Sequence, residues 1–293
     1  MSDDMPQRVV AHAKLNLSLR VLARETSGYH QLETVFCGID LADEIEISRT
    51  SAGITLEIAQ PAETPGRPPD VGPAEQNLAH RAASLFARET TIEGGIHIRL
   101  VKRIPAGAGL GGGSSDAAAV LRVLNERHAQ PLTQQTLLGL GARLGSDVPF
   151  FLAEAPLALA WGRGERILPL PALPVAPVVL AVPPERVSTA DAYAALDSPR
   201  PPVPAIVKLP RTWHDAAVSA HNDFEDVVFA RHPRLRALRQ ALADAGAMLA
   251  RLTGSGSVVF GVFEEGAAAG AAARELARSQ ADVAIIVTRS RAH

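Results

Sequence analysis

A glycine-rich turn between a strand pattern and an alanine-rich helix pattern constrains the fold of this 293-residue chain more than any other feature. The segment runs from Pro105 to Ala119, with five glycines within the seven residues Gly107–Gly113. Glycines let the backbone adopt positive φ and approach a ligand closely. The following helix presents unpaired N–H groups and the positive end of its dipole, which bind phosphate oxygens. The pattern therefore predicts a phosphate-binding loop, with Ser114 and Ser115 adding hydroxyls at the start of the helix.

Three other interpretations of the glycines fit less well. A flexible linker does not usually run from a strand directly into an alanine-rich helix. The G-x-x-x-x-G-K-[ST] spacing of a Walker A loop is missing. Residues 107–112 fit G-x-G-x-x-G, but no early βαβ unit surrounds them, as a dinucleotide-binding domain requires.

Hydrophobic periodicity along the chain indicates an α+β protein. From Ala13 to Val21 apolar and polar residues alternate, which predicts a strand with Lys14 and Asn16 on its non-core face. Proline- and glycine-rich stretches at 60–72 and 199–210 predict connectors. We expect two domains, 1–165 and 166–293. Strands are predicted at 13–21, 45–47, 54–58, 96–101, 150–153, 157–161, 178–182, 248–252, 257–263 and 283–288, and helices at 77–89, 115–128, 134–144, 233–245 and 267–277.

Composition excludes several classes of function. The formal net charge is -2 and no long basic run occurs, so we expect no nucleic-acid partner. The single cysteine, Cys37, forms no internal disulfide and is expected to be buried and unreactive. The N-terminus lacks the apolar stretch of a secretory signal, and prolines interrupt the longest apolar strings. We therefore expect a soluble cytoplasmic protein with no membrane association.

Asp147 is the carboxylate best placed for chemistry on a phosphate. Phosphoryl transfer to an alcohol uses a carboxylate to orient the hydroxyl and to accept its proton. Asp147 precedes Pro149 in an apolar surrounding, which is an unusual place for a surface residue. A helix N-cap or turn aspartate is the alternative. For Lys14, which could tune such a carboxylate, the alternative is a solvated strand lysine.

Four segments resemble motifs of the GHMP kinases, a superfamily of small-molecule kinases. The glycine-rich segment is similar to their phosphate-binding loop, and a late segment is similar to their C-terminal glycine motif. The motifs occur in the family's order between residues 13 and 257, which is far more specific than any one of them. They are Ala13–Leu17 with Gly28–His30, Pro105–Ala119, Leu144–Phe151 and Leu252–Ser257.

The resemblance implies a fold and an activity. The fold is a two-domain GHMP kinase fold, with an N-terminal ATP-binding α/β domain, a C-terminal ferredoxin-like α+β domain and the active site between them. The activity is phosphoryl transfer from ATP to an alcohol, with Lys14 and Asp147 as the catalytic pair. The implied ATP-binding residues are Asn77, Lys102, Pro105, Ala106, Gly107, Ala108, Gly109, Leu110, Gly111, Gly112, Gly113, Ser114 and Ser115.

Part of the resemblance is to GHMP kinases that act on a cytidine diphosphate-linked polyol in isoprenoid precursor biosynthesis. It implies that Tyr29 and Tyr193 flank the cytosine and that His30 hydrogen-bonds to its edge. Stacking of a base on an aromatic side chain contributes roughly 1–3 kcal/mol per contact. Asn16 and Thr189 are implied to contact the same substrate. The alternative for the two tyrosines is a place in the core or at its rim.

Magnesium is expected with ATP, because phosphoryl transfer needs charge neutralisation on the β and γ phosphates. Some GHMP kinases hold it with a loop serine and a separate glutamate. Ser114 or Ser115 is the serine candidate here, but no glutamate can be assigned, so we predict no protein metal site. The histidines show no ligand spacing for zinc.

Three rival functions can be compared with the sequence, and the pattern that the third one requires is absent. A GHMP kinase for homoserine or mevalonate has no use for the base-reading segment Gly28–His30. A non-catalytic nucleotide-binding protein would not need both Lys14 and Asp147. A dinucleotide-dependent reductase needs its glycine loop early in the chain and an acidic residue on the next strand. We expect small-molecule substrates and a monomer or homodimer.

Overall fold

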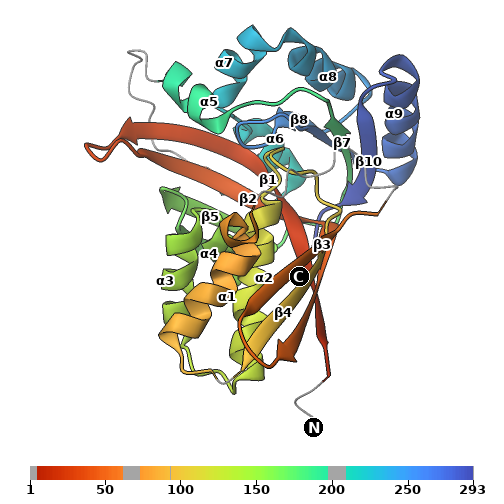
Figure 1. The fold of residues 1–293 in the computed structure, drawn as a ribbon. Helices are drawn as coiled ribbons and strands as arrows, with labels where there is room; N and C mark the ends of the chain where they lie inside the picture. The colour runs from red at the N-terminus through yellow and green to blue at the C-terminus, as the bar shows by residue number, and fades with distance from the viewer. Residues whose placement is uncertain (1–4, 62–72, 93, 197–208, 293) are drawn as a thin grey trace.

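The computed structural model describes residues 5–61, 73–92, 94–196 and 209–292. Within them, strands form two sheets, and helices cover one sheet in the lower half of Figure 1 and the other in the upper half. The predicted α+β class is confirmed. The two predicted connectors, 60–72 and 199–210, lie largely outside the described residues.

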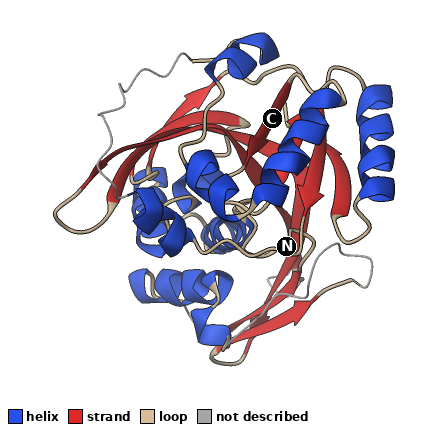
Figure 2. Cartoon of the chain, turned by 90° about the horizontal axis from the view of Figure 1, so that it is seen from above, coloured by secondary structure: helices blue, strands red, loops and turns tan. Residues whose placement is uncertain are grey.

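The larger sheet has the order β3-β4-β2-β5-β6, with β1 paired to β2. The β3–β4 pair is parallel and the other pairs are antiparallel. β1 and β2 are long enough to form the sheet and then continue beyond it as a two-stranded arm, visible in both views (Figures 1 and 2). The strands are β1 (Gln7–Arg24), β2 (His30–Thr50), β3 (Ile54–Ala59), β4 (Gly95–Val101), β5 (Leu157–Gly162) and β6 (Arg166–Leu170).

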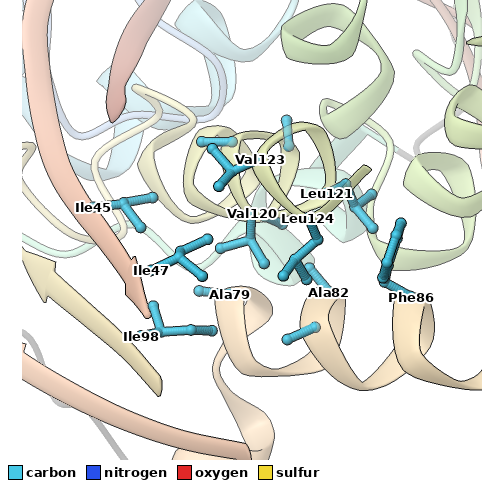
Figure 3. Packing of buried hydrophobic residues seen from close by; sticks show 14 of the residues in the cluster. Ile45, Ile47, Ala79, Ala82, Phe86, Ile98, Val120, Leu121, Val123 and Leu124 are labelled. Carbon is cyan, nitrogen blue, oxygen red and sulfur yellow. The ribbon is translucent and has the colours of Figure 1, made fainter. Parts of the chain in front are cut away.

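Helices α1 and α2 pack on this sheet through small residues. Ala79 and Ala82 of α1 lie against α2, while Ile47 and Ile98 close the layer from the strands (Figure 3). Alanine adds little bulk, so the helices approach closely and the larger side chains fill the space between them and the sheet. The helices of this half are α1 (Leu78–Glu89), α2 (Gly112–Arg127), α3 (Gln134–Leu144) and α4 (Val148–Leu152), with a short 3₁₀ turn η1 (Ala74–Gln76) before α1.

Side-chain caps explain where two of these helices begin. The Asn77 side chain accepts a hydrogen bond from Ala79 N, and the Thr133 side chain accepts one from Thr136 N. Each cap satisfies a backbone donor that the first turn of a helix leaves unpaired. Thr133 as the cap of α3 is the predicted one.

The smaller sheet is antiparallel throughout and has the order β10-β7-β9-β8. Its β8–β9 pair confirms the predicted hairpin. One buried cluster joins Leu15 of β1 to Leu180 of β7 and Phe260 of β9, so the two sheets share a core. The elements are β7 (Pro177–Val182), α5 (Thr189–Leu196), α6 (Trp213–Ser219), α7 (Phe224–Arg231), α8 (Pro233–Asp244), β8 (Leu249–Leu252), β9 (Val259–Val262), α9 (Gly266–Ser279) and β10 (Ala284–Arg289).

The predicted strand at 150–153 is wrong, because Phe150–Leu152 belong to α4 and Ala153 is its C-cap. A short apolar run does not distinguish a buried strand from a buried helix, and Pro149 at the start of α4 favours the helix. Helices α5, α6 and α7 and strand β6 were not predicted. β6 pairs with β5, so the chain leaves the larger sheet after Leu170; the domain boundary at 165/166 stays a prediction.

Candidate active site

The glycine-rich segment forms a loop between β4 and α2 and borders a cavity of about 480 Å³. The lining includes residues 105–114 together with Asn77 and Lys102, which unites most of the predicted ATP-binding set. Ser114 lines this cavity, whereas Ser115 is buried and borders a different cavity beside β1. The N-terminus of the 16-residue helix α2 lies at the cavity and favours an anion there.

Two glycines of the loop are required by close approach and by φ. Gly111, the N-cap of α2, has φ +74, and a Cβ there would lie 2.9 Å from the Phe151 ring and 3.1 Å from Lys14 Cε. Gly109 has φ +81, and its Cβ would lie 2.1 Å from the Thr253 carbonyl oxygen. Any side chain at either position would therefore push the loop away from its neighbours.

Lys14 lies where the phosphate loop ends. Its backbone N donates to Leu110 O at 3.0 Å, and its Nζ lies 3.3 Å from Asp147 Oδ2. Nζ also donates to Asn16 Oδ1 at 2.8 Å. Lys14 is buried, with 3% of its surface exposed, so the alternative of a solvated strand lysine is wrong.

Asp147 occupies the N-cap position of α4, but its side chain makes no cap hydrogen bond. Its carboxylate instead faces Lys14, and 31% of the side chain is exposed. A capping aspartate would point its oxygens at backbone N–H groups of the first turn. The geometry therefore leaves one charged, partly open carboxylate beside a buried ammonium and the end of the phosphate loop.

Thr253 connects three of the sequence motifs. Its Oγ1 accepts from Asn16 N at 3.2 Å and lies 3.1 Å from Gly109 O and 3.3 Å from Asn16 Oδ1, either of which can take its single proton. The side chain of Asn16 in turn donates to Thr34 Oγ1 at 2.8 Å. The sequence did not single out Thr253. The Asn16 amide, predicted to reach the substrate, is engaged by Lys14 and Thr34.

The predicted acceptor residues do not all lie together. His30 and Tyr193 stack on each other, with ring centroids 4.6 Å apart, and Tyr193 also contacts Phe224 edge-on. Burial, with a smaller contribution from the nearby Asp147 charge, raises the pKa of Tyr193 to about 12, so its phenol is neutral. Thr189 Oγ1 lies 2.8 Å from Ser255 Oγ in the late glycine motif. Tyr29 is 58% exposed, and its ring contacts the guanidinium of Arg163 instead.

Lys102 belongs to a buried ion cluster that sequence reasoning missed. Its Nζ donates to Asp116 Oδ2 at 2.7 Å and to Asp43. Asp43 Oδ1 also accepts from the backbone N–H groups of Arg103 and Ile104, at 2.5 and 2.8 Å. The cluster joins Lys102, which follows β4, to Asp116, which follows the first turn of α2. Asp116 stood within the glycine-rich segment, but nothing in the sequence shows its partners.

The protonation of this cluster follows from its burial. Burial raises the pKa of Asp116 to about 7, although the Lys102 charge opposes the shift. Burial also acts to lower the pKa of Lys102, but the two carboxylates outweigh it and raise that pKa. Asp116 Oδ1 is buried without a hydrogen-bond partner among the described residues.

A second cavity, of about 1220 Å³, adjoins the phosphate loop on its other side. It borders Pro105–Ala108, the segment between β7 and α5, and α7, and its lining includes neither Lys14 nor Asp147. Cys37 is buried as predicted, and burial raises its pKa to about 12. Over the described ranges, no group of three or more His, Cys, Asp or Glu residues is placed to hold a metal, and no helix is long and apolar enough to cross a membrane.

Two domain models of one sequence family match the chain. Residues 77–154 match the model described as GHMP kinases N terminal domain, and residues 205–282 match the one described as GHMP kinases C terminal. A 4-diphosphocytidyl-2-C-methyl-D-erythritol kinase of Solibacter usitatus is 41% identical over 276 residues, covering 90% of this chain and 84% of that protein. The protein of the same name from Citrifermentans bemidjiense is 42% identical over 279 residues, covering 93% and 95%.

Solved structures of kinases are similar to this chain over nearly its whole length. A crystal structure of 4-(cytidine 5'-diphospho)-2C-methyl-D-erythritol kinase is 36% identical, with a TM-score of 0.78, and the match covers 97% of this chain and 99% of that chain. A homoserine kinase from Cytophaga hutchinsonii gives a TM-score of 0.72 at 19% identity, covering 99% and 95%. At that identity the likeness concerns the fold alone.

Proposed function

This chain belongs to the GHMP kinase family, and we propose that it transfers a phosphoryl group from ATP to the 2-hydroxyl of 4-diphosphocytidyl-2-C-methyl-D-erythritol. The membership confirms the predicted family and its two-domain fold. The observation that carries the proposed reaction is the Lys14–Asp147 pair, 3.3 Å apart at the end of the phosphate loop. The named relatives supply the identity of the acceptor.

In this proposal the phosphates of ATP lie on the loop 105–114 and the N-terminus of α2. Backbone N–H groups and the helix dipole favour the phosphate charge there. Asn77 and Lys102 border the same cavity and form its nucleotide end. The γ-phosphoryl group then points toward Gly111, which adjoins Lys14.

The acceptor hydroxyl is placed between Asp147 and the γ-phosphorus. The Asp147 carboxylate accepts the hydroxyl proton as the new oxygen–phosphorus bond forms, and the bond to the β-phosphate oxygen breaks to release ADP. Lys14, held by Asn16, keeps the carboxylate oriented and places positive charge beside the transferring group. The product is the 2-phosphate of the acceptor.

Recognition of the cytosine is assigned to Tyr29, His30 and Tyr193, with Thr189 and Asn16 as nearby polar residues. His30 and Tyr193 stack at 4.6 Å, so His30 covers one face of the Tyr193 ring. A cytosine between Tyr29 and Tyr193 would stack on that face of Tyr193 only after His30 turns toward the edge of the base. Tyr193, supported by Phe224, is the better fixed of the two.

Magnesium is part of the proposal and supplies charge neutralisation on the β and γ phosphates. The Ser114 hydroxyl borders the phosphate cavity, and Asp116, the acidic residue of that lining, is already paired with Lys102. This donor set fits an ion held mainly by ATP and water, with Ser114 as a single protein ligand. The enzyme would act in the non-mevalonate route to isoprenoid precursors, in the cytoplasm, as a monomer or homodimer without nucleic-acid or membrane partners.

The test is ADP release by the purified protein with Mg-ATP. Acceptors are the cytidyl-diphospho-methylerythritol substrate, homoserine and mevalonate. We expect turnover with the first alone, and a loss of at least about a hundredfold in kcat for Asp147→Asn. Asp244→Asn, an exposed change on α8, is the matched control and keeps full activity. Turnover with homoserine or mevalonate would refute the acceptor, and an active Asp147→Asn would refute the mechanism.

A further inference from the structure

Tyr29 lies in the turn between β1 and β2. This turn ends the two-stranded arm, which extends away from the rest of the ribbon in Figure 1. Glu25 N donates to Tyr29 O at 2.7 Å, and Gly28 N donates to Glu25 O at 2.9 Å. These bonds fix the backbone of the turn but not the ring of Tyr29, which is 58% exposed. Because β2 pairs with β5 from Leu32 to Cys37, only the tip of the arm beyond Val21 and Leu32 has two strands alone. Such a tip is flexible unless side chains hold it.

Arg163, from the turn between β5 and β6, supplies that hold. Its Nη2 and Nε donate to Glu25 Oε2 at 2.5 and 3.2 Å, and its guanidinium carbon lies 4.0 Å from the centroid of the Tyr29 ring. Nη2 also donates to Ser27 Oγ at 3.2 Å. Hydrogen bonds from Arg163 and Ser27 lower the pKa of Glu25, so the pair stays ionised at neutral pH. A planar guanidinium stacks on one face of an aromatic ring and leaves the other face available.

The turn that carries Arg163 also lies against the catalytic turn. A Cβ added at Gly164 would lie 3.4 Å from the Ser146 side chain and 3.9 Å from Asp147 Oδ1. Arg163 N donates to Glu165 Oε2 at 2.6 Å, which fixes the turn internally. The backbone of the arm already pairs with β5 as far as Leu32 and Gly162. Arg163 extends this attachment with side-chain contacts that run from the turn beside Asp147 to Glu25 and Tyr29 at the tip of the arm.

We propose that Arg163 is a positioning residue for the acceptor, which covers one face of Tyr29 and holds the ring at a fixed distance from Asp147, so that the other face receives a planar nucleobase. This inference rests on the proposed function. It assigns no contact between Arg163 and the reacting atoms. Glu25 is the anchor that fixes the guanidinium against the ring.

The first test compares Michaelis constants. Arg163→Met keeps the apolar stem and removes the charge; we expect KM for the cytidyl acceptor to rise about tenfold, with KM for ATP and kcat within about twofold of wild type. Arg163→Lys keeps the charge but loses the planar stack, so its effect is intermediate. Arg166→Met, at an exposed arginine three residues on, is the matched control and changes neither constant. An unchanged acceptor KM in Arg163→Met, or an equal rise in the KM for ATP, overturns the inference.

A double-mutant cycle tests whether Arg163 acts through Tyr29. In a Tyr29→Leu background, Arg163→Met should add little to the acceptor KM, because the ring that it positions is gone. Fully additive effects would mean that Arg163 acts on the acceptor by another route, and would overturn the inference. If Arg163→Met does not fold, Glu25→Gln replaces it in the same cycle, with a smaller rise expected.

Failure of the inference and failure of the proposed function give different results. If wild type does not phosphorylate the cytidyl acceptor, the proposed function fails and the inference with it. If wild type does so and the variants keep its acceptor KM, the proposed function stands and the inference alone fails.

Discussion

An ion cluster lies at each end of the candidate active site, and the two clusters differ in how deeply they are buried. At the nucleotide end, Lys102 lies between Asp43 and Asp116, and all three side chains are at least nine-tenths buried. At the acceptor end, Arg163 pairs with Glu25 at the surface, with 41% and 23% of the two side chains exposed. Both clusters pair a basic side chain with carboxylates, but one lies in the protein interior and the other is partly exposed to water.

The two clusters therefore differ in the free energy that it costs to break them. A buried charge has lost its hydration, so removing one partner leaves the others in an apolar surrounding without compensation. An exposed pair keeps much of its water and contributes little to folding. Opening the cluster that holds the phosphate loop should therefore cost much free energy, whereas breaking the exposed Arg163–Glu25 pair should change the free energy of unfolding little.

Lys102→Met should have the largest effect on stability. It leaves the carboxylates of Asp43 and Asp116 buried together without their cation, and we expect a loss of about 3–5 kcal/mol in the free energy of unfolding. Urea denaturation followed by circular dichroism measures the loss. Arg163→Met is the control at the other end and should change the unfolding midpoint little. Equal midpoints for the two variants would remove the contrast between the two clusters.

The pH dependence of stability should come from the buried end. Burial raises the pKa of Asp116 to about 7 in the folded protein, above its ordinary value of 3.8. The folded state then retains a proton that the unfolded state releases, so this group's contribution to stability is lost as the pH rises from about 4 to about 7. Asp116→Asn removes the titration, so wild type should lose more stability than this variant between pH 5 and pH 8.

Urea unfolding at the two pH values measures that difference. Asp244→Asn is the exposed control, and its stability should follow wild type at both pH values. Parallel behaviour of wild type and Asp116→Asn would show that the carboxyl of Asp116 does not titrate in this range.

Thr253→Val should reduce stability less than Lys102→Met does, but it should affect both the phosphate loop and the Lys14–Asp147 pair. The change keeps the shape and removes the hydroxyl shared by Asn16 and Gly109, at a cost of roughly 1–3 kcal/mol. Because Asn16 holds Lys14 and Gly109 belongs to the phosphate loop, the KM values for ATP and for the acceptor should rise together. Thr90→Val, at the end of α1, is the control: it also loses one part-buried hydrogen bond, from Thr90 Oγ1 to Phe86 O, and should leave both KM values unchanged. A rise in only one constant would mean that the two ends are not coupled through Thr253.

Sequence periodicity predicted most of the regular elements, because alternation and helix caps are local properties. It did not predict α4, whose apolar run fits either a strand or a helix until Pro149 and its packing are considered. Lys14 and Asp147 were paired by resemblance, and the structure brings them to 3.3 Å. Their catalytic roles, like those of the other predicted site residues, stay predictions.

The sequence alone could not predict the two ion clusters, because their members are far apart along the chain. Arg163 and Glu25 are 138 residues apart, and Lys102 and Asp43 are 59 apart, so no spacing rule connects them. Surface arginines and glutamates are common, and a buried aspartate looks the same in a sequence as an exposed one. Only the fold shows which of these charges share a site.

The Lys102–Asp116 pair also has a consequence for chain entropy. The pair joins residues 14 positions apart and so closes the phosphate segment into a ring, while Asp43 fixes one end of that ring to β2. A loop tied at both ends has few conformations left when folding is complete. A nucleotide that binds there does not have to order it again, so more of the contact energy is retained as affinity. The glycines give the segment its shape, and the ion pair ensures that the shape exists before ATP arrives.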